Sequence, residues 1–168
     1  MRTTKIILLL LGSAALLLAQ TTSKVVPNPA FDKMETLVGA WKGTTDEGGK
    51  QMPSNARFQI ISDGSALMGW LNERTNDEMV TMFHPDGADL MATHYCAVHN
   101  QPRMVLVRGG DPNRLVFKFK DGTNITRGAG HMNQLVFIFD KPNHHVEEWT
   151  YLEKGKEIAA HFDFHRKG

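Results

Sequence analysis

The chain contains a single cysteine, Cys96, so no intramolecular disulfide can form whatever the redox state of its compartment. Charge of one sign is not in excess either, since 19 lysines and arginines stand against 18 aspartates and glutamates. Nucleic-acid binding depends on a clustered basic face, and this balance gives no support for such a partner. The stability of the fold must therefore come from a packed core, and 168 residues are enough for one domain.

Only one long apolar run is present, and it lies near the N-terminus. Arg2 and Lys5 precede residues 6–11, and the mostly apolar segment continues to Ala19. A positive start, a short apolar stretch and a small final residue are typical of a secretory signal peptide. The run is too short, and polar residues follow it too closely, for a membrane-spanning helix. We therefore expect residues 1–19 to be a signal peptide, with an uncleaved membrane anchor as the alternative.

Cleavage after Ala19 would give an exported protein, located in the periplasm or outside the cell. The mature chain would have a formal net charge of about −1, because the removed segment carries two bases and no acid. We expect neither a nucleic-acid partner nor membrane association after cleavage. The sequence leaves the oligomeric state open.

The start of the mature chain predicts a linker followed by one helix. Residues 20–30 are polar and contain two prolines, which is typical of a linker. Apolar residues then recur at helical spacing between Phe31 and Val38, and Gly39 ends this pattern. One short helix fits this segment.

From Trp41 onward the helical period gives way to short runs of β-forming residues that are separated by turn residues. Such runs occupy residues 58–61, 66–71, 79–83, 90–95, 104–107, 115–119, 135–139, 146–152 and 158–164. Pairs such as Asp86-Gly87 and Lys154-Gly155 supply the positive φ angles that tight hairpins need. Together with the strand that starts at Trp41, the pattern predicts about ten strands with short connections, which requires antiparallel neighbours.

A long antiparallel meander protects its edges best by closing on itself. We therefore predict an all-β fold for residues 31–168: a closed antiparallel up-and-down barrel of lipocalin-like (calycin-like) type with one short N-terminal helix. The alternation within strands supports one wet and one dry face, because Leu115, Phe117 and Phe119 alternate with lysines. Phe117 should therefore point inward.

The last predicted hairpin places a carboxylate inside the barrel. With the Lys-Gly pair as its tip, Trp149 lies opposite Ala160, and Glu147 shares the inward face of Trp149. A carboxylate among apolar side chains is costly unless it is paired or protonated. Arg103 or a ligand is the expected partner. A one-residue bulge would turn Glu148 inward instead.

The sequence Leu37-Val38-Gly39-Ala40-Trp41, a helix end followed by a Gly-x-Trp strand, resembles the opening of lipocalin-like barrels, including nitrobindin-like and fatty-acid-binding types. This resemblance implies that Trp41 packs across the closed end of the barrel. His94-Tyr95-Cys96, Asn100-Gln101-Pro102-Arg103-Met104 and Gly130-His131-Met132 resemble a bacterial family of exported lipocalin-like proteins of unknown function. The second resemblance covers residues 31–166 and implies a fold but no particular reaction.

Nitrobindin-like proteins hold haem through a histidine near the C-terminus, and the positional candidates here are His161 and His165. Both alternate with the inward apolar residues of the last strand, so the predicted register turns them outward. This orientation argues against haem in the barrel, and we expect no cofactor.

The central histidines are candidate metal ligands. His94 and Cys96 are two residues apart on one predicted strand, so they share a face. The predicted hairpin places His94 opposite Met79 and turns His84 to the other face, although His131 could approach from another strand. A zinc site needs three or four ligands that converge tetrahedrally. We therefore expect no bound zinc or iron, and a buried, hydrogen-bonded His94 beside a small Cys96 is favoured.

The segment Asn100-Gln101-Pro102-Arg103 combines two amides with a guanidinium, a donor set suited to a carboxylate or phosphate. It lies between two predicted strands, where the rim of a barrel would be. Two roles remain open for Gln101 and Arg103. They bind a ligand, or they satisfy loop backbone groups while Arg103 pairs with a carboxylate.

We predict that the barrel binds a small, partly apolar ligand in its interior, with a few polar anchors among aromatic side chains. The candidate ligand-binding residues are Trp41, His94, Cys96, Gln101, Arg103, Phe117, His131, Glu147, Trp149 and Tyr151. Two other classes remain open: a hydrolase or isomerase that uses His94 and Glu147 as an acid/base pair, and a packed, non-enzymatic interaction module. Binding is favoured because no specific catalytic spacing is present, and Cys96 lies in no nucleophile motif.

The signal-peptide prediction can be tested on the protein isolated from its native host. N-terminal sequencing of the soluble protein should find a chain that begins near Gln20, because signal peptidase cleaves after small residues such as Ala19. Detection of Met1 on the mature, soluble protein would contradict export by this route.

Overall fold

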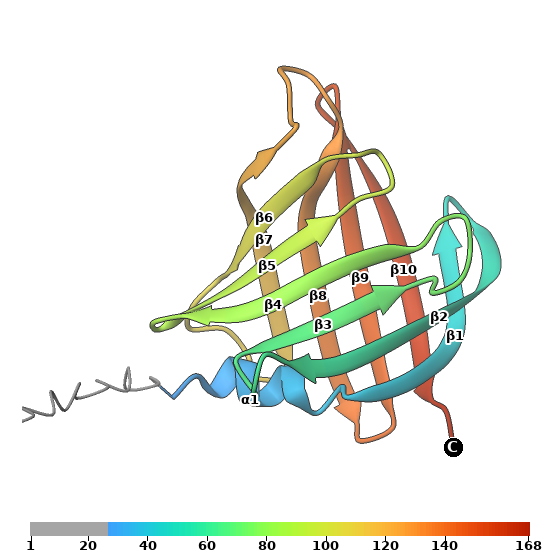
Figure 1. Ribbon diagram of the computed structural model, residues 1–168. Coiled ribbons are helices and arrows are strands. Elements are labelled where there is room, and N and C mark those ends of the chain that lie inside the picture. Colours follow the sequence, from blue (N-terminus) through green and yellow to red (C-terminus); the bar gives the residue numbers. More distant parts are fainter. Residues whose placement is uncertain (1–26) are drawn as a thin grey trace, which may run out of the picture.

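Ten antiparallel strands and one short helix make up the computed structural model, which describes residues 27–168 (Figure 1). The elements are α1 (Pro29–Glu35), β1 (Gly39–Glu47), β2 (Lys50–Ile61), β3 (Ala66–Leu71), β4 (Met79–Asp86), β5 (Asp89–Tyr95), β6 (Gln101–Leu106), β7 (Arg114–Thr123), β8 (His131–Lys141), β9 (His144–Glu153) and β10 (Lys156–Arg166). The predicted signal peptide and most of the predicted linker lie outside the described residues. No helix within residues 27–168 is long and apolar enough to cross a membrane.

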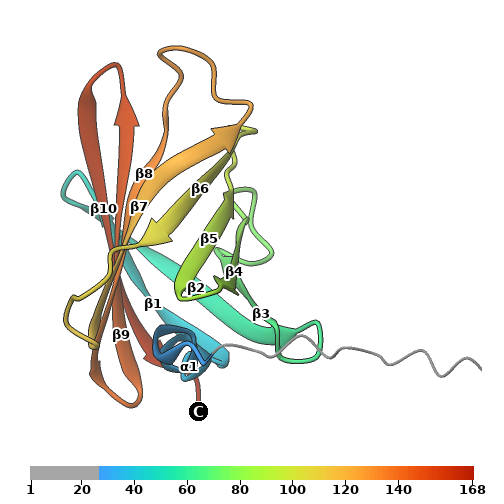
Figure 2. The same cartoon turned by 90° about the vertical axis from the view of Figure 1, so that its left-hand side faces the viewer.

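The strands form one closed sheet. Each strand pairs with the next along the chain, and β1 pairs with β10, so that every strand has two neighbours. Seen from the side, β8 to β10 form one wall, β3 to β6 form the facing wall, and α1 lies across one end (Figure 2). The predicted closed antiparallel barrel with one short helix is confirmed.

The helix begins earlier than the sequence analysis placed it. The Asn28 side chain accepts a hydrogen bond from the Phe31 amide, and Pro29 occupies the first turn, where its missing N–H costs nothing. The helix ends at Glu35, so Val38 lies beyond it and is exposed. The predicted span from Phe31 to Val38 was therefore displaced, because the analysis followed apolar spacing and overlooked the Asn-Pro cap.

Two hairpins differ from their predicted form. The sequence analysis missed the β1–β2 turn at Gly48-Gly49, where both glycines have positive φ. The β4–β5 hairpin turns one residue later than predicted, so His94 lies opposite Thr81 rather than Met79. This moves the pairing by two residues, and each side chain keeps its face. His84 is accordingly exposed and His94 buried, on opposite faces as predicted.

Aromatic side chains fill the interior. The rings of Phe83, Phe117 and Phe137 contact one another edge to face, with centroids 5.7 to 6.5 Å apart. Gly69 makes room for Phe58, since a Cβ at this glycine would lie 2.7 Å from the Phe58 ring. The predicted inward orientation of Phe117 is confirmed, because this side chain is fully buried.

The two ends of the barrel differ in how far the inward side chains of β10 are buried. On the inward face of β10, Phe164 is fully buried, Phe162 is 6% exposed, Ala160 is half-buried and Ile158 is 44% exposed. Exposure thus rises from the end covered by α1 toward the β9–β10 turn (Figure 1). Tyr151, which lies opposite Ile158 on β9, is half-buried as well. We call the end near the β9–β10 turn the open end.

Trp41 closes the sealed end, as the resemblance implied. Its indole Nε1 donates a hydrogen bond to the Leu37 carbonyl over 2.7 Å, and its ring meets the His145 ring edge to face, with centroids 4.4 Å apart. The Arg166 guanidinium lies 4.2 Å from the centre of the Trp41 ring and donates hydrogen bonds to the carbonyls of Thr36 and Val38. Trp41 therefore links the segment after α1 to both the interior and the C-terminal strand.

The cost of losing this seal can be measured by urea unfolding. Trp41→Phe should lower the free energy of unfolding by about 1–3 kcal/mol, because the buried Leu37 carbonyl loses its donor. Trp70→Phe is the matched control, since Trp70 is only half-buried and packs under the Arg57 guanidinium on the outer face. This control should cost less than about 1 kcal/mol. Equal losses in the two variants would contradict the sealing role of Trp41.

Candidate functional site

A row of polar side chains crosses the otherwise apolar interior. It consists of His145, Glu147, Trp149, His94 and Thr81, and we call it the polar row. Strand β9 supplies the first three, because alternate residues of a strand share a face. His94 comes from β5 and Thr81 from its partner β4. All five residues are buried.

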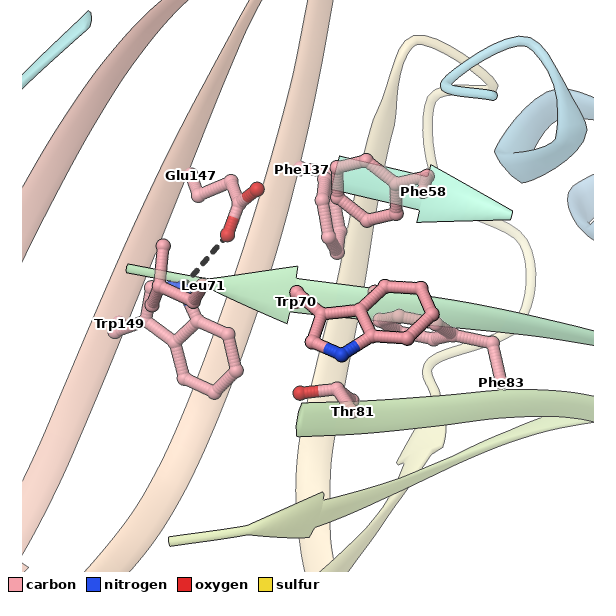
Figure 3. A pocket seen from close by; sticks show the side chains of 9 residues that line it. Phe58, Trp70, Leu71, Thr81, Phe83, Phe137, Glu147 and Trp149 are labelled. Atoms are coloured by element: carbon pink, nitrogen blue, oxygen red, sulfur yellow. Dashed lines mark hydrogen bonds between the residues drawn. The ribbon is translucent and has the colours of Figure 1, made fainter. Parts of the chain in front are cut away.

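The inward Glu147 is satisfied by its own strand. One oxygen accepts a hydrogen bond from Trp149 Nε1 over 2.9 Å (Figure 3), and the other accepts one from His145 Nε2 over 3.1 Å. The predicted inward register of Glu147 is confirmed, and Glu148 points outward to Arg114. Arg103, which the sequence analysis considered as the partner of Glu147, lies elsewhere.

His145 was not found by the sequence analysis. It is fully buried, and its Nδ1 has no hydrogen-bond partner within the described residues. The signal was present in the sequence, because His145, Glu147 and Trp149 continue the same period-two pattern toward the start of the strand. The predicted strand starts at Val146, which leaves His145 in the turn, whereas β9 begins at His144.

His94 has one satisfied and one unsatisfied nitrogen. Its Nδ1 lies 2.9 Å from the Thr81 hydroxyl, whereas its Nε2 is buried and has no partner in the part of the chain that the structure describes. The His94 ring packs against Trp149, with centroids 4.7 Å apart. Burial lowers the pKa of His94 to about 3, so the imidazole is neutral at physiological pH. A neutral ring offers Nε2 as a donor or as an acceptor, depending on its tautomer.

The three segments that carry the second resemblance meet at the open end. The Cys96 amide donates to the Asn100 carbonyl, and the Asn100 side-chain amide donates to the Gly130 carbonyl over 2.8 Å. Gly130 in turn packs on Tyr151, where a Cβ would lie 2.1 Å from the phenol oxygen. Burial, with Glu153 and Cys96 nearby, raises the pKa of Tyr151, so the phenol keeps its proton. The Asn100 Oδ1 atom is buried, and none of the described residues donates a hydrogen bond to it.

A small cavity lies beside the polar row. It has a volume of about 10 Å³, lies between Thr81, Glu147 and Trp149, and is walled by Phe58, Phe83 and other apolar groups (Figure 3). This volume accommodates about one water molecule. Two larger hollows of about 380 and 360 Å³ lie at the ends of the barrel, one between α1 and the β8–β9 turn and the other beside the β9–β10 turn.

The structure sorts the predicted site residues into three places. Trp41, His94, Phe117, Glu147 and Trp149 are buried inside. Cys96, His131 and Tyr151 are half-buried toward the open end, where the His131 ring packs on Phe119 with centroids 4.3 Å apart. Gln101 accepts a hydrogen bond from Thr123, and Arg103 pairs with Asp121, both at partly exposed positions of β6 and β7.

The structure does not join the residues considered for acid/base catalysis. Glu147 bonds to His145 and Trp149, whereas His94 bonds to Thr81, so the indole of Trp149 separates the two groups. The two haem candidates, His161 and His165, are exposed on the outer face of β10.

The neutral state of His94 has a consequence for stability. An unfolded histidine takes up a proton below pH 6.5, whereas folded His94 does so only near pH 3. The neutral His94 therefore contributes its full share to the free energy of unfolding above pH 6.5. Between pH 6.5 and about pH 3 this share is lost, by about 1.4 kcal/mol for each pH unit. In His94→Asn, which keeps a polar group for Thr81, urea unfolding between neutral and acid pH should show a correspondingly shallower loss. Parallel curves for the variant and the wild type would contradict a neutral, buried His94.

Comparisons with known proteins identify the fold and no family. No protein-family model matches the sequence, and no curated protein matches it either. Among solved structures, the crystal structure of Rv2717c from M. tuberculosis is similar, with a TM-score of 0.59 and 10% sequence identity. The match covers 86% of this chain and 100% of that chain. At this identity the similarity shows a common fold and carries neither a ligand nor an activity to this protein.

Proposed function

We propose that this protein is an exported, lipocalin-like binding protein that holds a small, partly apolar ligand at the open end of its barrel. The observation that carries this proposal is a pair of buried polar atoms, His94 Nε2 and Asn100 Oδ1, that have no hydrogen-bond partner among residues 27–168. Both belong to the end of β5 and the turn that follows it. The His94 ring packs on Trp149, and Asn100 bonds to Gly130, which packs on Tyr151.

Unpaired buried polar atoms are the expected anchors of such a ligand. Each costs about 1–3 kcal/mol when it is left without a hydrogen bond, so a ligand group that bonds to it recovers this free energy. Asn100 uses its amide nitrogen to bond the Gly130 carbonyl, which leaves Oδ1 as an acceptor. The ligand should therefore carry at least one hydrogen-bond donor.

The apolar part of the ligand has a matching surface. Trp149 and Ala160 lie directly opposite each other on β9 and β10, and Tyr151 lies one step nearer to the rim. Aromatic walls with a few polar groups are typical of small-molecule sites. The small cavity between Thr81 and Trp149, both neighbours of His94, has room for a single polar group of the ligand. The rest of the ligand would lie between this cavity and the open end.

Export rests on the apolar N-terminal segment, and the lipocalin-like assignment rests on the sequence resemblance. Both therefore belong to the proposal rather than to the observed fold. The alternative function is that of a packed interaction module with no ligand, and the small volume of the cavity beside the polar row is also consistent with it.

Ala160→Trp distinguishes these two functions. If the open end is a binding site, the indole fills it and lowers the affinity for the probe 1-anilinonaphthalene-8-sulfonate by at least about tenfold, which corresponds to about 1.4 kcal/mol. The half-buried position of Ala160 leaves space for the larger side chain, so overpacking should cost no more than about 1–3 kcal/mol. Probe titration and thermal unfolding measure the two effects.

His161→Trp is the matched control, because His161 is the exposed outward neighbour of Ala160 on the same strand. It should change neither probe affinity nor the free energy of unfolding by more than about 0.5 kcal/mol. If the wild type takes up no probe and Ala160→Trp unfolds, the ligand-binding function is wrong and the packed interaction module replaces it.

A further inference from the structure

Two histidines and two aspartates meet on the outer face of the barrel, near the β8–β9 turn. His144 on β9 and His165 on β10 are directly paired across the two strands, with ring centroids 4.6 Å apart. Asp163 shares the outer face of His165, because it lies two residues earlier on the same strand. Asp140, at the end of β8, contacts His144. No spacing in the sequence predicts this group, since its members come from three different strands.

The geometry of three of these side chains resembles an unfilled coordination sphere. One oxygen of Asp163 lies 3.0 Å from His144 Nε2 and 3.3 Å from His165 Nε2. In a tetrahedral zinc site, bonds of about 2.0–2.1 Å place neighbouring ligand atoms about 3.3 Å apart. The three ligand atoms lie within 4.8 Å of one another, so a small rotation of the exposed His165 completes the arrangement. Within residues 27–168 no other group of three or more His, Cys, Asp or Glu side chains meets this criterion.

Asp140 is an outer partner of the site: it contacts the ring of His144 but does not bind the metal itself. It is in hydrogen-bond contact with His144 Nδ1, which fixes the ring orientation. On the other side of the ring, Nε2 lies 3.0 Å from a carboxylate oxygen of Asp163. When the ring binds a metal through Nε2, its proton stays on Nδ1 and Asp140 accepts that hydrogen bond. Metal-bound histidines in proteins are commonly held by a carboxylate in this way.

We propose that His144, Asp163 and His165 bind one divalent transition-metal ion of the zinc class. Two imidazoles and a carboxylate suit zinc and its neighbours rather than calcium or magnesium, which prefer all-oxygen sites. Three protein ligands at an exposed position leave the fourth coordination site to water or to a ligand in solution. This site is on the outer wall beside the sealed end, so it is separate from the binding function proposed for the open end.

The charged side chains around the site add little to its attraction for a cation. Asp140 and Asp163 supply two negative charges, whereas Lys141 lies 4.0 Å from Asp140 and Lys42 is paired with His165 across β1 and β10. The two negative and two positive charges nearly cancel, so the surrounding side chains attract a cation only weakly. An ion that binds here must therefore gain its affinity from directional bonds to the imidazole rings. This proposal replaces the expectation of no bound metal, which considered only the central histidines.

The test uses protein that carries no polyhistidine tag and has been stripped of metal. Zn²⁺ is titrated into it in competition with a chromophoric chelator. The pH is kept above about 7, where ordinary histidines are neutral. One equivalent should bind, and Co²⁺ in its place should give the intense visible absorption of a tetrahedral site. Asp140→Asn removes only the outer partner and should weaken Zn²⁺ binding roughly 10–100-fold. His165→Ala and His144→Ala remove ligands and should weaken it further.

His161→Ala is the control, because His161 is exposed on the same face of β10, four residues before His165. It should leave both the Zn²⁺ affinity and the Co²⁺ spectrum unchanged. His165 is 71% exposed, so His165→Ala should fold normally and decide the question even if His144→Ala is unstable. The proposal is wrong if the wild type binds no equivalent of Zn²⁺, or if His161→Ala weakens binding as much as His165→Ala does.

Discussion

The pairing of β1 with β10 is the constraint on which the rest of the structure depends. It converts a meander of strands into a closed sheet, so all inward side chains must share one interior. Gly43 permits this close approach, since a Cβ at that position would lie 1.7 Å from the Asp163 carbonyl oxygen. Closure also removes the free edges that would otherwise invite pairing with other chains.

Within this interior, the polar row is the feature that a purely structural barrel would not need. The buried Glu147 accepts hydrogen bonds from Trp149 and His145, and these offset the cost of removing a carboxylate from water. Within residues 27–168, His94 and His145 each keep one buried ring nitrogen without a hydrogen-bond partner. An apolar core of the same volume would avoid these costs, which is why the row, and the end of the barrel that it approaches, support a binding role.

The period of two along a strand places different chemistry on the two sides of one wall. His144 and His145 are neighbours in the sequence, yet His144 faces the outer cluster with Asp163 and His165, and His145 faces Glu147 inside. The same separation holds on β10, where inward Ala160 and Phe162 alternate with outward His161 and Asp163. The two proposed sites can therefore be changed independently by substitutions on the same strands.

From the sequence alone we predicted a closed barrel of about ten strands and a last hairpin whose favoured register turns Glu147 inward, and the structure confirms both. These follow from local rules, because alternation and turn residues act within a few positions of each other. Only the tertiary structure decided that Glu147 bonds to His145 rather than Arg103, and that His144, Asp140 and His165 form one cluster. Such contacts join side chains whose distance depends on the pairing and twist of several strands at once, and no local pattern in the sequence encodes that distance.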